Sequence, residues 1–263
     1  NFDTAGYPRF SSLITTATKL KPKKRPFSWL LTSIEELYDA RYAHNTADLK
    51  ADAPEQSDRL SDIFPVFVVD FFSQRYGLRS LVDQSCWDLL FNMHAQRKQY
   101  LEVEVFARFL EEFYDQDDLL FFLYVRSVAQ KMLDRPFKNR WKERKPPTLV
   151  LDKRQCIAVS RTVFGSEQDP MFREFMAMIE NELVGDPRSG QRIEVTHFLH
   201  LAVVGYHETR PDDGLGDAGA GGPPAGPPGG GAPLSPDEQE DRFREAGANY
   251  APARAGHAGN ALR

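Results

Sequence analysis

The sequence predicts an all-α domain of helix-loop-helix pairs with very short strands, followed by a disordered tail. Apolar residues recur at helical spacing over most of residues 28–206. A pattern of one aliphatic residue, Glu and Val occurs at Leu101–Glu102–Val103 and again at Ile193–Glu194–Val195, and each copy leads into an amphipathic helix. After Glu208 the chain turns to Gly, Pro, Ala and Asp, which cannot offset the entropy cost of folding, so residues 208–263 are predicted to be disordered.

The N-terminal segment, residues 1–26, has no sustained periodicity and predicts an extended basic arm. Ser28 is a typical helix cap and predicts a helix that continues through Tyr42. A second helix should end at Gly77, with Pro65 in its early turns, where a proline costs least. The basic run that closes the arm consists of Lys19, Lys21, Lys23, Lys24 and Arg25.

Four helical pairs are expected along the rest of the chain, in a helical domain that spans residues 27–207. Residues 80–95 predict a helix, and the first Leu-Glu-Val strand then leads into a helix that ends at Tyr114. Residues 119–133 are apolar around most of the helix circumference, which indicates burial on nearly all sides. The expected pairs are 28–76, 80–114, 117–164 and 169–207, and a division into lobes 27–114 and 115–207 stays open.

The repeated pattern resembles the second half of an EF-hand, in which the eighth loop residue is aliphatic and pairs with the partner loop. With Leu101 as position eight, positions one, three, five and six are His94, Gln96, Lys98 and Gln99, and position twelve is Val105. With Ile193 as position eight, the ligand positions supply one carboxylate, Asp186, and position twelve is His197. A weaker third copy starts at Leu149 and places Lys153 at position twelve.

These loops lack the carboxylates and the bidentate twelfth ligand that calcium requires, so we predict a scaffold with no metal and no cofactor. An apolar-x-apolar pattern also precedes helices in ordinary α-rich domains, and that interpretation stays open.

Composition excludes several classes of protein. The formal net charge is −5, which argues against a general nucleic-acid binder because such a protein needs a basic surplus. The two cysteines, Cys86 and Cys156, predict neither a disulfide framework nor a zinc site, and they favour a reducing compartment. The longest apolar run, residues 64–72, is interrupted by Pro65 and Asp70, so no membrane span is expected.

Two clusters of polar residues are candidates for chemical sites. His197 and His200 share a helix face at a spacing that can clamp a transition metal, but no third ligand is evident, and surface histidines are the simpler interpretation. The acidic run at residues 111–118 could pair carboxylates for acid-base work. Its position at a helix junction favours capping of the next helix instead. No nucleophile or phosphate-loop signature is present, so we predict that the chain is not an enzyme.

The strongest interaction candidate is the proline-bounded loop at residues 135–147. Its basic side chains surround one aromatic residue, a combination that can bind an acidic surface by charge steering and an apolar anchor. A solvated charged loop is the alternative. The predicted partner-binding residues are Lys138, Arg140, Trp141, Lys142, Arg144 and Lys145.

Residues 26–42, which begin Pro26–Phe27–Ser28–Trp29, together with Trp87 through Tyr114, resemble the EF-hand-like helical modules of axonemal, flagella-associated proteins. The resemblance implies a non-catalytic structural or docking protein of the ciliary axoneme or another cytoskeletal assembly in the cytoplasm. Its partners would be proteins of that assembly, with tubulin among the candidates, and it would bind neither nucleic acid nor membrane. The alternative is a calcium- or calmodulin-linked regulatory adaptor.

Overall fold

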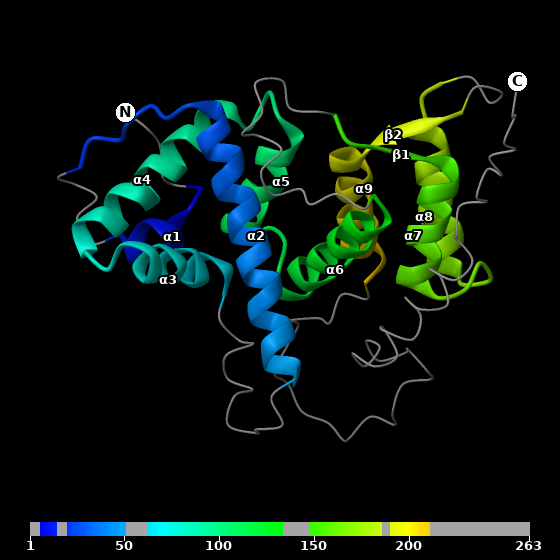
Figure 1. Cartoon of the computed structure of the whole chain (residues 1–263), viewed down its shortest axis with the longest axis horizontal. Helices are drawn as coiled ribbons and strands as arrows, with labels where there is room; N and C mark the ends of the chain where they lie inside the picture. The colour runs from blue at the N-terminus through cyan, green and yellow to red at the C-terminus, as the bar shows by residue number, and fades with distance from the viewer. Residues whose placement is uncertain (1–5, 15–19, 51–62, 134–147, 186–189, 211–263) are drawn as a thin grey trace, which may run out of the picture. The chain divides into compact units, whose positions relative to one another are not determined.

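The computed structural model describes residues 6–14, 20–50, 63–133, 148–185 and 190–210. Within these ranges the regular secondary structure is helical except for one pair of short strands, so the all-α prediction is confirmed (Figure 1). The elements, in order, are α1 (Pro8–Leu13), α2 (Phe27–Lys50), α3 (Phe64–Tyr76), α4 (Arg79–Gln96), α5 (Leu101–Leu110), α6 (Gln116–Met132), β1 (Val150–Asp152), α7 (Lys153–Phe164), α8 (Pro170–Glu182), β2 (Arg192–Glu194) and α9 (Val195–Thr209).

The chain divides into one unit of residues 1–211 and a second unit of residues 212–263. The lobes that the sequence left open, 27–114 and 115–207, both fall within the first unit. The predicted tail lies outside the described residues from residue 211 onward, so its disorder stays a prediction.

Local sequence signals explain where several helices begin and end. Pro65 occupies the first turn of α3, where its missing N–H would have no intrahelical partner. Gly77 ends that helix with a φ of 69°, a conformation that glycine adopts without a steric penalty. Asp115 caps α6 by accepting a hydrogen bond from the Asp118 backbone N–H, and the Asp118 carboxylate reciprocates at the Asp115 N–H, each at 3.0 Å.

The N-terminal arm differs from the extended segment that was predicted. Residues Pro8–Leu13 form the short helix α1, which contacts α3. Tyr7 and Phe10 are buried, at 1% and 0% exposure. Because these aromatic side chains leave water when they pack, the first part of the arm is anchored to the domain by the hydrophobic effect.

The first predicted strand is wrong, because Leu101–Glu102–Val103 forms the first turn of α5. Tyr100 has extended dihedral angles and precedes the helix, and Glu102 and Glu104 lie in the first turn, where the helix dipole favours negative charge. A strand also needs a hydrogen-bonding neighbour, and the described ladder joins other segments.

That ladder is an antiparallel pairing of β1 with β2. Leu151 lies opposite Ile193, and both side chains are buried. The third copy of the sequence pattern placed Leu149 at position eight, whereas the residue that pairs with Ile193 is Leu151, two residues later. A two-residue shift keeps the same face of the strand inward, which explains why the apolar pattern did not distinguish the two registers. Leu149 instead accepts a hydrogen bond at its carbonyl oxygen from the Val195 N–H, at 2.9 Å.

The centre of the core is an aromatic cluster around Tyr38 of α2. The Tyr38 ring has its centroid 4.9 Å from that of Phe122 in α6 and 5.6 Å from that of Phe106 in α5. Phe64 and Phe109 lie at 6.3 and 6.4 Å from the same ring. These distances are within the range of favourable aromatic pairs, so the cluster ties four helices together by contacts among side chains distant in sequence.

Phe106 in α5 and Phe198 in α9 are each 0% exposed, so we assign both to the core. We predict that Phe106→Ala or Phe198→Ala lowers the free energy of unfolding by about 3–5 kcal/mol, because each leaves a cavity in a packed core. Urea denaturation followed by circular dichroism measures the effect. Phe113→Ala, at a ring that is 54% exposed, is the matched control and should cost much less. Wild-type stability in either buried variant would contradict the assignment.

Candidate functional site

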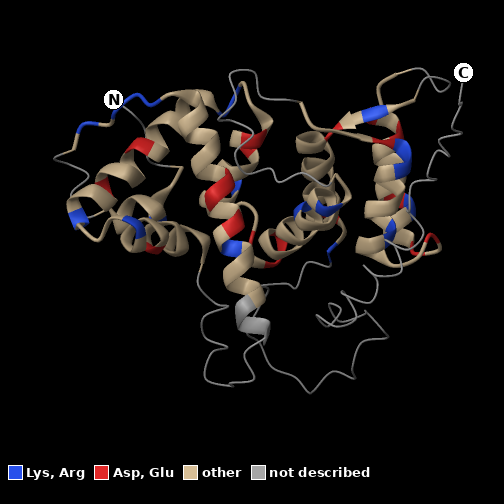
Figure 2. Cartoon of the chain, in the orientation of Figure 1, with Lys and Arg blue, Asp and Glu red and all other residues tan. Residues whose placement is uncertain are grey.

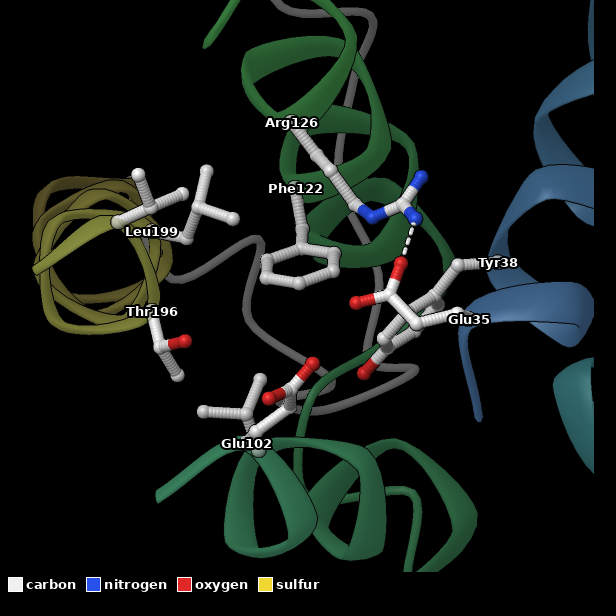
Figure 3. Close-up of a pocket in the computed structure, with 9 residues that line it drawn as sticks. Glu35, Tyr38, Glu102, Phe122, Arg126, Thr196 and Leu199 are labelled. Carbon is white, nitrogen blue, oxygen red and sulfur yellow. Dashed lines mark hydrogen bonds and ion pairs between the residues drawn. The ribbon is translucent and has the colours of Figure 1, made fainter. Parts of the chain in front are cut away.

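A deeply buried charge cluster surrounds Arg126 of α6. The Arg126 side chain is 4% exposed, and its guanidinium donates to the Glu35 carboxylate, which is 3% exposed (Figure 3). A second N–H of the same guanidinium donates to Asp39 Oδ1 at 2.7 Å. Glu35 and Asp39 lie one turn apart on α2, so one arginine bridges two carboxylates on the same helix face.

Tyr38 lies between the two carboxylates in sequence and under the guanidinium in space. Its ring centroid is 5.6 Å from the Arg126 guanidinium carbon, a distance suited to a cation–π contact. Its hydroxyl is buried and has no hydrogen-bond partner among the described side and main chains. Burial, followed by the Glu102 carboxylate, raises the pKa of Tyr38 well above its ordinary value, so the phenol stays protonated at neutral pH.

A small cavity adjoins this cluster between α2, α5, α6 and α9. Glu102 and Thr196 face it from α5 and α9, and Phe122 forms one wall (Figure 3). Its volume is about 20 Å³, enough for a water molecule, whereas small-molecule sites typically hold roughly 300–1,000 Å³. The cluster is therefore a structural ion-pair site and not a substrate site of ordinary size.

A second charge cluster joins the start of α6 to the end of α9. Asp118 Oδ2 lies 2.8 Å from His207 Nδ1, and Arg210 pairs with Asp115. The His207 ring also packs on Phe113 and Tyr114, with centroids 5.4 and 5.3 Å apart. Desolvation raises the pKa of Asp118 despite these partners.

The histidines of α9, of which His197 and His200 were candidate metal ligands, have different surroundings. His197 Nε2 is 3.6 Å from Glu182 Oε2, whereas His207 is held by Asp118 at the other end of α9. Burial lowers the pKa of His200. No group of three His, Cys, Asp or Glu side chains within the part of the chain that the structure describes is arranged to hold a metal ion.

The acidic run at residues 111–118 is divided among structural roles. Asp115 and Asp118 form the capping box of α6, as the helix-junction interpretation predicted. Glu111 instead pairs with Arg97, which also binds Glu104 at 2.8 Å between Nε and Oε2. These hydrogen bonds raise the pKa of Arg97 and lower that of Glu104.

Cys86 and Cys156 are free and buried. Burial raises the pKa of each thiol to about 12, so the nucleophilic thiolate is scarce at neutral pH. Both cysteines are therefore packing residues.

The predicted partner-binding residues, Lys138, Arg140, Trp141, Lys142, Arg144 and Lys145, all lie outside the described residues. Their role stays a prediction. None of the helices in the described ranges is long and apolar enough to cross a membrane.

The Arg126 cluster was not predicted from the sequence. One signal was available, since Arg126 is a lone cation directly after the apolar run of residues 119–125 in a helix predicted to be buried. Its carboxylate partner could not be found in the same way, because Glu35 lies 91 residues earlier.

No protein-family model, curated protein or solved structure shows significant similarity to this chain.

We predict that Arg126→Met lowers the free energy of unfolding by about 3–5 kcal/mol, because it leaves the Glu35 carboxylate buried without its guanidinium. Thermal and urea denaturation measure the loss. Glu35→Leu combined with Arg126→Met should recover much of it, since an apolar pair has no charge to desolvate. The control is Arg75→Met, which breaks a more exposed pair with Glu36 and should cost less than about 1 kcal/mol. Equal losses in the two single variants would contradict the structural role of the buried pair.

Proposed function

We propose that this chain is a non-catalytic docking protein built on a degenerate EF-hand-like pair that works without calcium. The observation that carries the proposal is the β1–β2 ladder, which joins two helix-loop-helix units at Leu151 and Ile193. An EF-hand pair joins its two loops at the eighth position in this manner. The first unit is α6 with α7 and the second is α8 with α9, and α6 contacts α9 while α7 contacts α8.

In the proposed EF-hand-like pair, the loop positions are numbered from the two residues that face each other in the ladder. With Leu151 as position eight, positions one, three and five of the first loop are Arg144, Pro146 and Thr148, none of which is a carboxylate. Position twelve becomes Gln155, whose Oε1 accepts a hydrogen bond from the Asp152 N–H at 3.0 Å and so caps α7. Calcium loops use a bidentate Glu at that position.

The second loop is equally poor in ligands. Asp186 is its one carboxylate at positions one, three and five, where Arg188 and Gly190 follow. Position twelve is His197, which lies beside Glu182. Replacement of ligands by capping and packing residues favours a fixed scaffold over the alternative, a calcium- or calmodulin-linked regulatory adaptor.

The buried ion pair also favours a fixed scaffold. A calcium switch changes the angle between packed helices. Here α2 is joined to α6 by Arg126, and its Tyr38 ring packs on α5 and α6. Moving α6 away from α2 would expose or unpair buried charge, which is costly.

The cytoskeletal setting of the proposal rests on the resemblance to axonemal modules. We propose the ciliary axoneme as the location, with tubulin or other axonemal proteins as partners. The basic loop around Trp141 is the proposed contact, because tubulin tails offer the acidic surface that such a loop fits.

Calorimetric titration tests the scaffold directly. We expect no stoichiometric binding heat with micromolar calcium, because neither paired loop offers more than one carboxylate at positions one, three and five. An intact calcium-binding EF-hand protein titrated in the same buffer is the positive control. A stoichiometric site of micromolar affinity would reject the scaffold proposal in favour of the regulatory adaptor.

Reversal of Lys142, Arg144 and Lys145 to Glu tests the contact. We expect weaker co-sedimentation with microtubules at low salt and an unchanged melting temperature, because the charges act through screened steering of the partner. The matched control reverses Lys131, Arg154 and Arg173, which are exposed residues of α6, α7 and α8. Microtubules whose acidic tails have been removed by protease should bind both proteins equally. Undiminished binding of the loop variant would exclude this loop as the contact.

A further inference from the structure

A lysine-rich segment, residues 20–26, lies ahead of α2 and is called here the strap. In Figure 2 it is the blue coil that leads into α2. Lys21 and Arg25 each precede a proline, and a residue in that position is restricted to extended conformations. An extended chain makes no hydrogen bonds within itself, so its backbone groups need other partners. The sequence therefore predisposes the strap to lie against another element.

Side chains of α4 provide those partners at one-turn intervals. Lys23 donates its N–H to Asp88 Oδ1 at 2.8 Å and accepts at its carbonyl oxygen from Asn92 Nδ2 at 2.8 Å. Arg25 donates its N–H to Asn92 Oδ1 at 2.9 Å. Gln84 donates to the Lys21 carbonyl oxygen at 3.1 Å. Both the oxygen and the nitrogen of the Asn92 amide are thus used to hold the backbone of the strap.

Asp88 is the buried carboxylate that pairs with the arginine of the strap. Its side chain is 0% exposed, and its Oδ2 atom accepts from Arg25 Nε at 2.8 Å and pairs with the same guanidinium's terminal nitrogen at 2.7 Å. The Arg25 guanidinium also lies 5.4 Å from the Trp29 ring centroid. The Arg25 side chain is therefore already engaged within the domain.

The three lysine side chains of the strap, unlike Arg25, are available to a partner. Lys21, Lys23 and Lys24 are exposed, and no ion pair joins them to an acid in the described ranges. Because the backbone is fixed on α4, these cations are presented along a pre-organised strip instead of a flexible chain. Pre-organisation lowers the entropy cost of binding a partner.

Two aromatic side chains, Phe27 and Tyr100, lie at one end of the strip and are called here the Phe27–Tyr100 step. Phe27 follows the strap directly, and its ring centroid lies 4.0 Å from that of Tyr100. Tyr100 is 41% exposed. An exposed aromatic beside a row of cations offers a partner both an apolar anchor and charge contacts.

We propose that the strap and the Phe27–Tyr100 step form a docking strip for an extended acidic segment of a partner protein. Lysine ammonium groups act as point charges that suit carboxylates, and the strip's arginine is already occupied by Asp88 and cannot grip a phosphate bidentately. The formal net charge of −5 disfavours a nucleic-acid backbone as the partner. This inference names a second contact for the proposed docking function and rests on that function.

The test uses the full chain and a fluorescent oligoglutamate peptide of about six residues, which spans the strip at roughly 3.3 Å per residue. Fluorescence anisotropy should show binding that weakens as salt rises, and a glutamine peptide of equal length should not bind. Reversal of Lys21, Lys23 and Lys24 to Glu should weaken binding about tenfold or more, because it replaces the attractive charge contacts of the three lysines by repulsive ones. Reversal of Lys131, Arg154 and Arg173 changes the net charge equally and should have little effect.

Asn92→Ala separates pre-organisation from charge. It keeps every lysine but removes the two hydrogen bonds from the Asn92 amide to the backbone of Lys23 and Arg25, so we expect a loss of about threefold. Three results would overturn the strip: no preference for glutamate over glutamine, equal losses in the two triple variants, or tighter binding of an oligothymidylate of equal length. Calcium titration and microtubule sedimentation do not involve this peptide, so failure here is distinguishable from failure of the proposed function.

Discussion

The ion pair between Arg126 and Glu35 is the interaction on which the arrangement of the helices depends. It joins α2 to α6 with both side chains almost fully removed from water. Removing two charges from water costs free energy, which only good pairing geometry and further hydrogen bonds can offset. Asp39 supplies a second acceptor for the guanidinium. A shift of either helix would leave a buried charge unpaired. The pair therefore specifies one relative position of α2 and α6 and penalises others.

The aromatic cluster supplies the stabilisation that this specificity requires. Tyr38 lies one turn or less from both carboxylates, and its ring contacts rings from three other helices. Apolar burial is roughly additive and insensitive to direction, whereas the ion pair is directional. Together they produce a core that is both stable and unique. A cavity of about 20 Å³, enough for a water molecule, lies at their junction.

The charges of the described residues are divided between two uses. Buried or helix-capping acids such as Asp88, Asp115 and Asp118 accept hydrogen bonds from backbone N–H groups and pair with histidine or arginine side chains, and so contribute to the fold. The exposed lysines of the strap have no such structural partner in the described ranges. Exposed charged side chains that make no ion pair within the domain are available to contact a partner. Within the described residues, the lysines of the strap are such side chains.

The sequence by itself determined the features that depend on near neighbours. Helical periodicity indicated the all-α class, Gly77 the end of α3, and the acidic junction at Asp115 the start of α6. Tertiary structure decided what depends on distant partners. Leu101–Val103 has a strand-like pattern but is helical, since Ile193 pairs with Leu151. Glu35 meets Arg126 across 91 residues, and Asp88 fixes a strap 63 residues before it. A strand, an ion pair or a docked segment is stable only when its partner is present, and a linear pattern does not specify which distant residue that partner is.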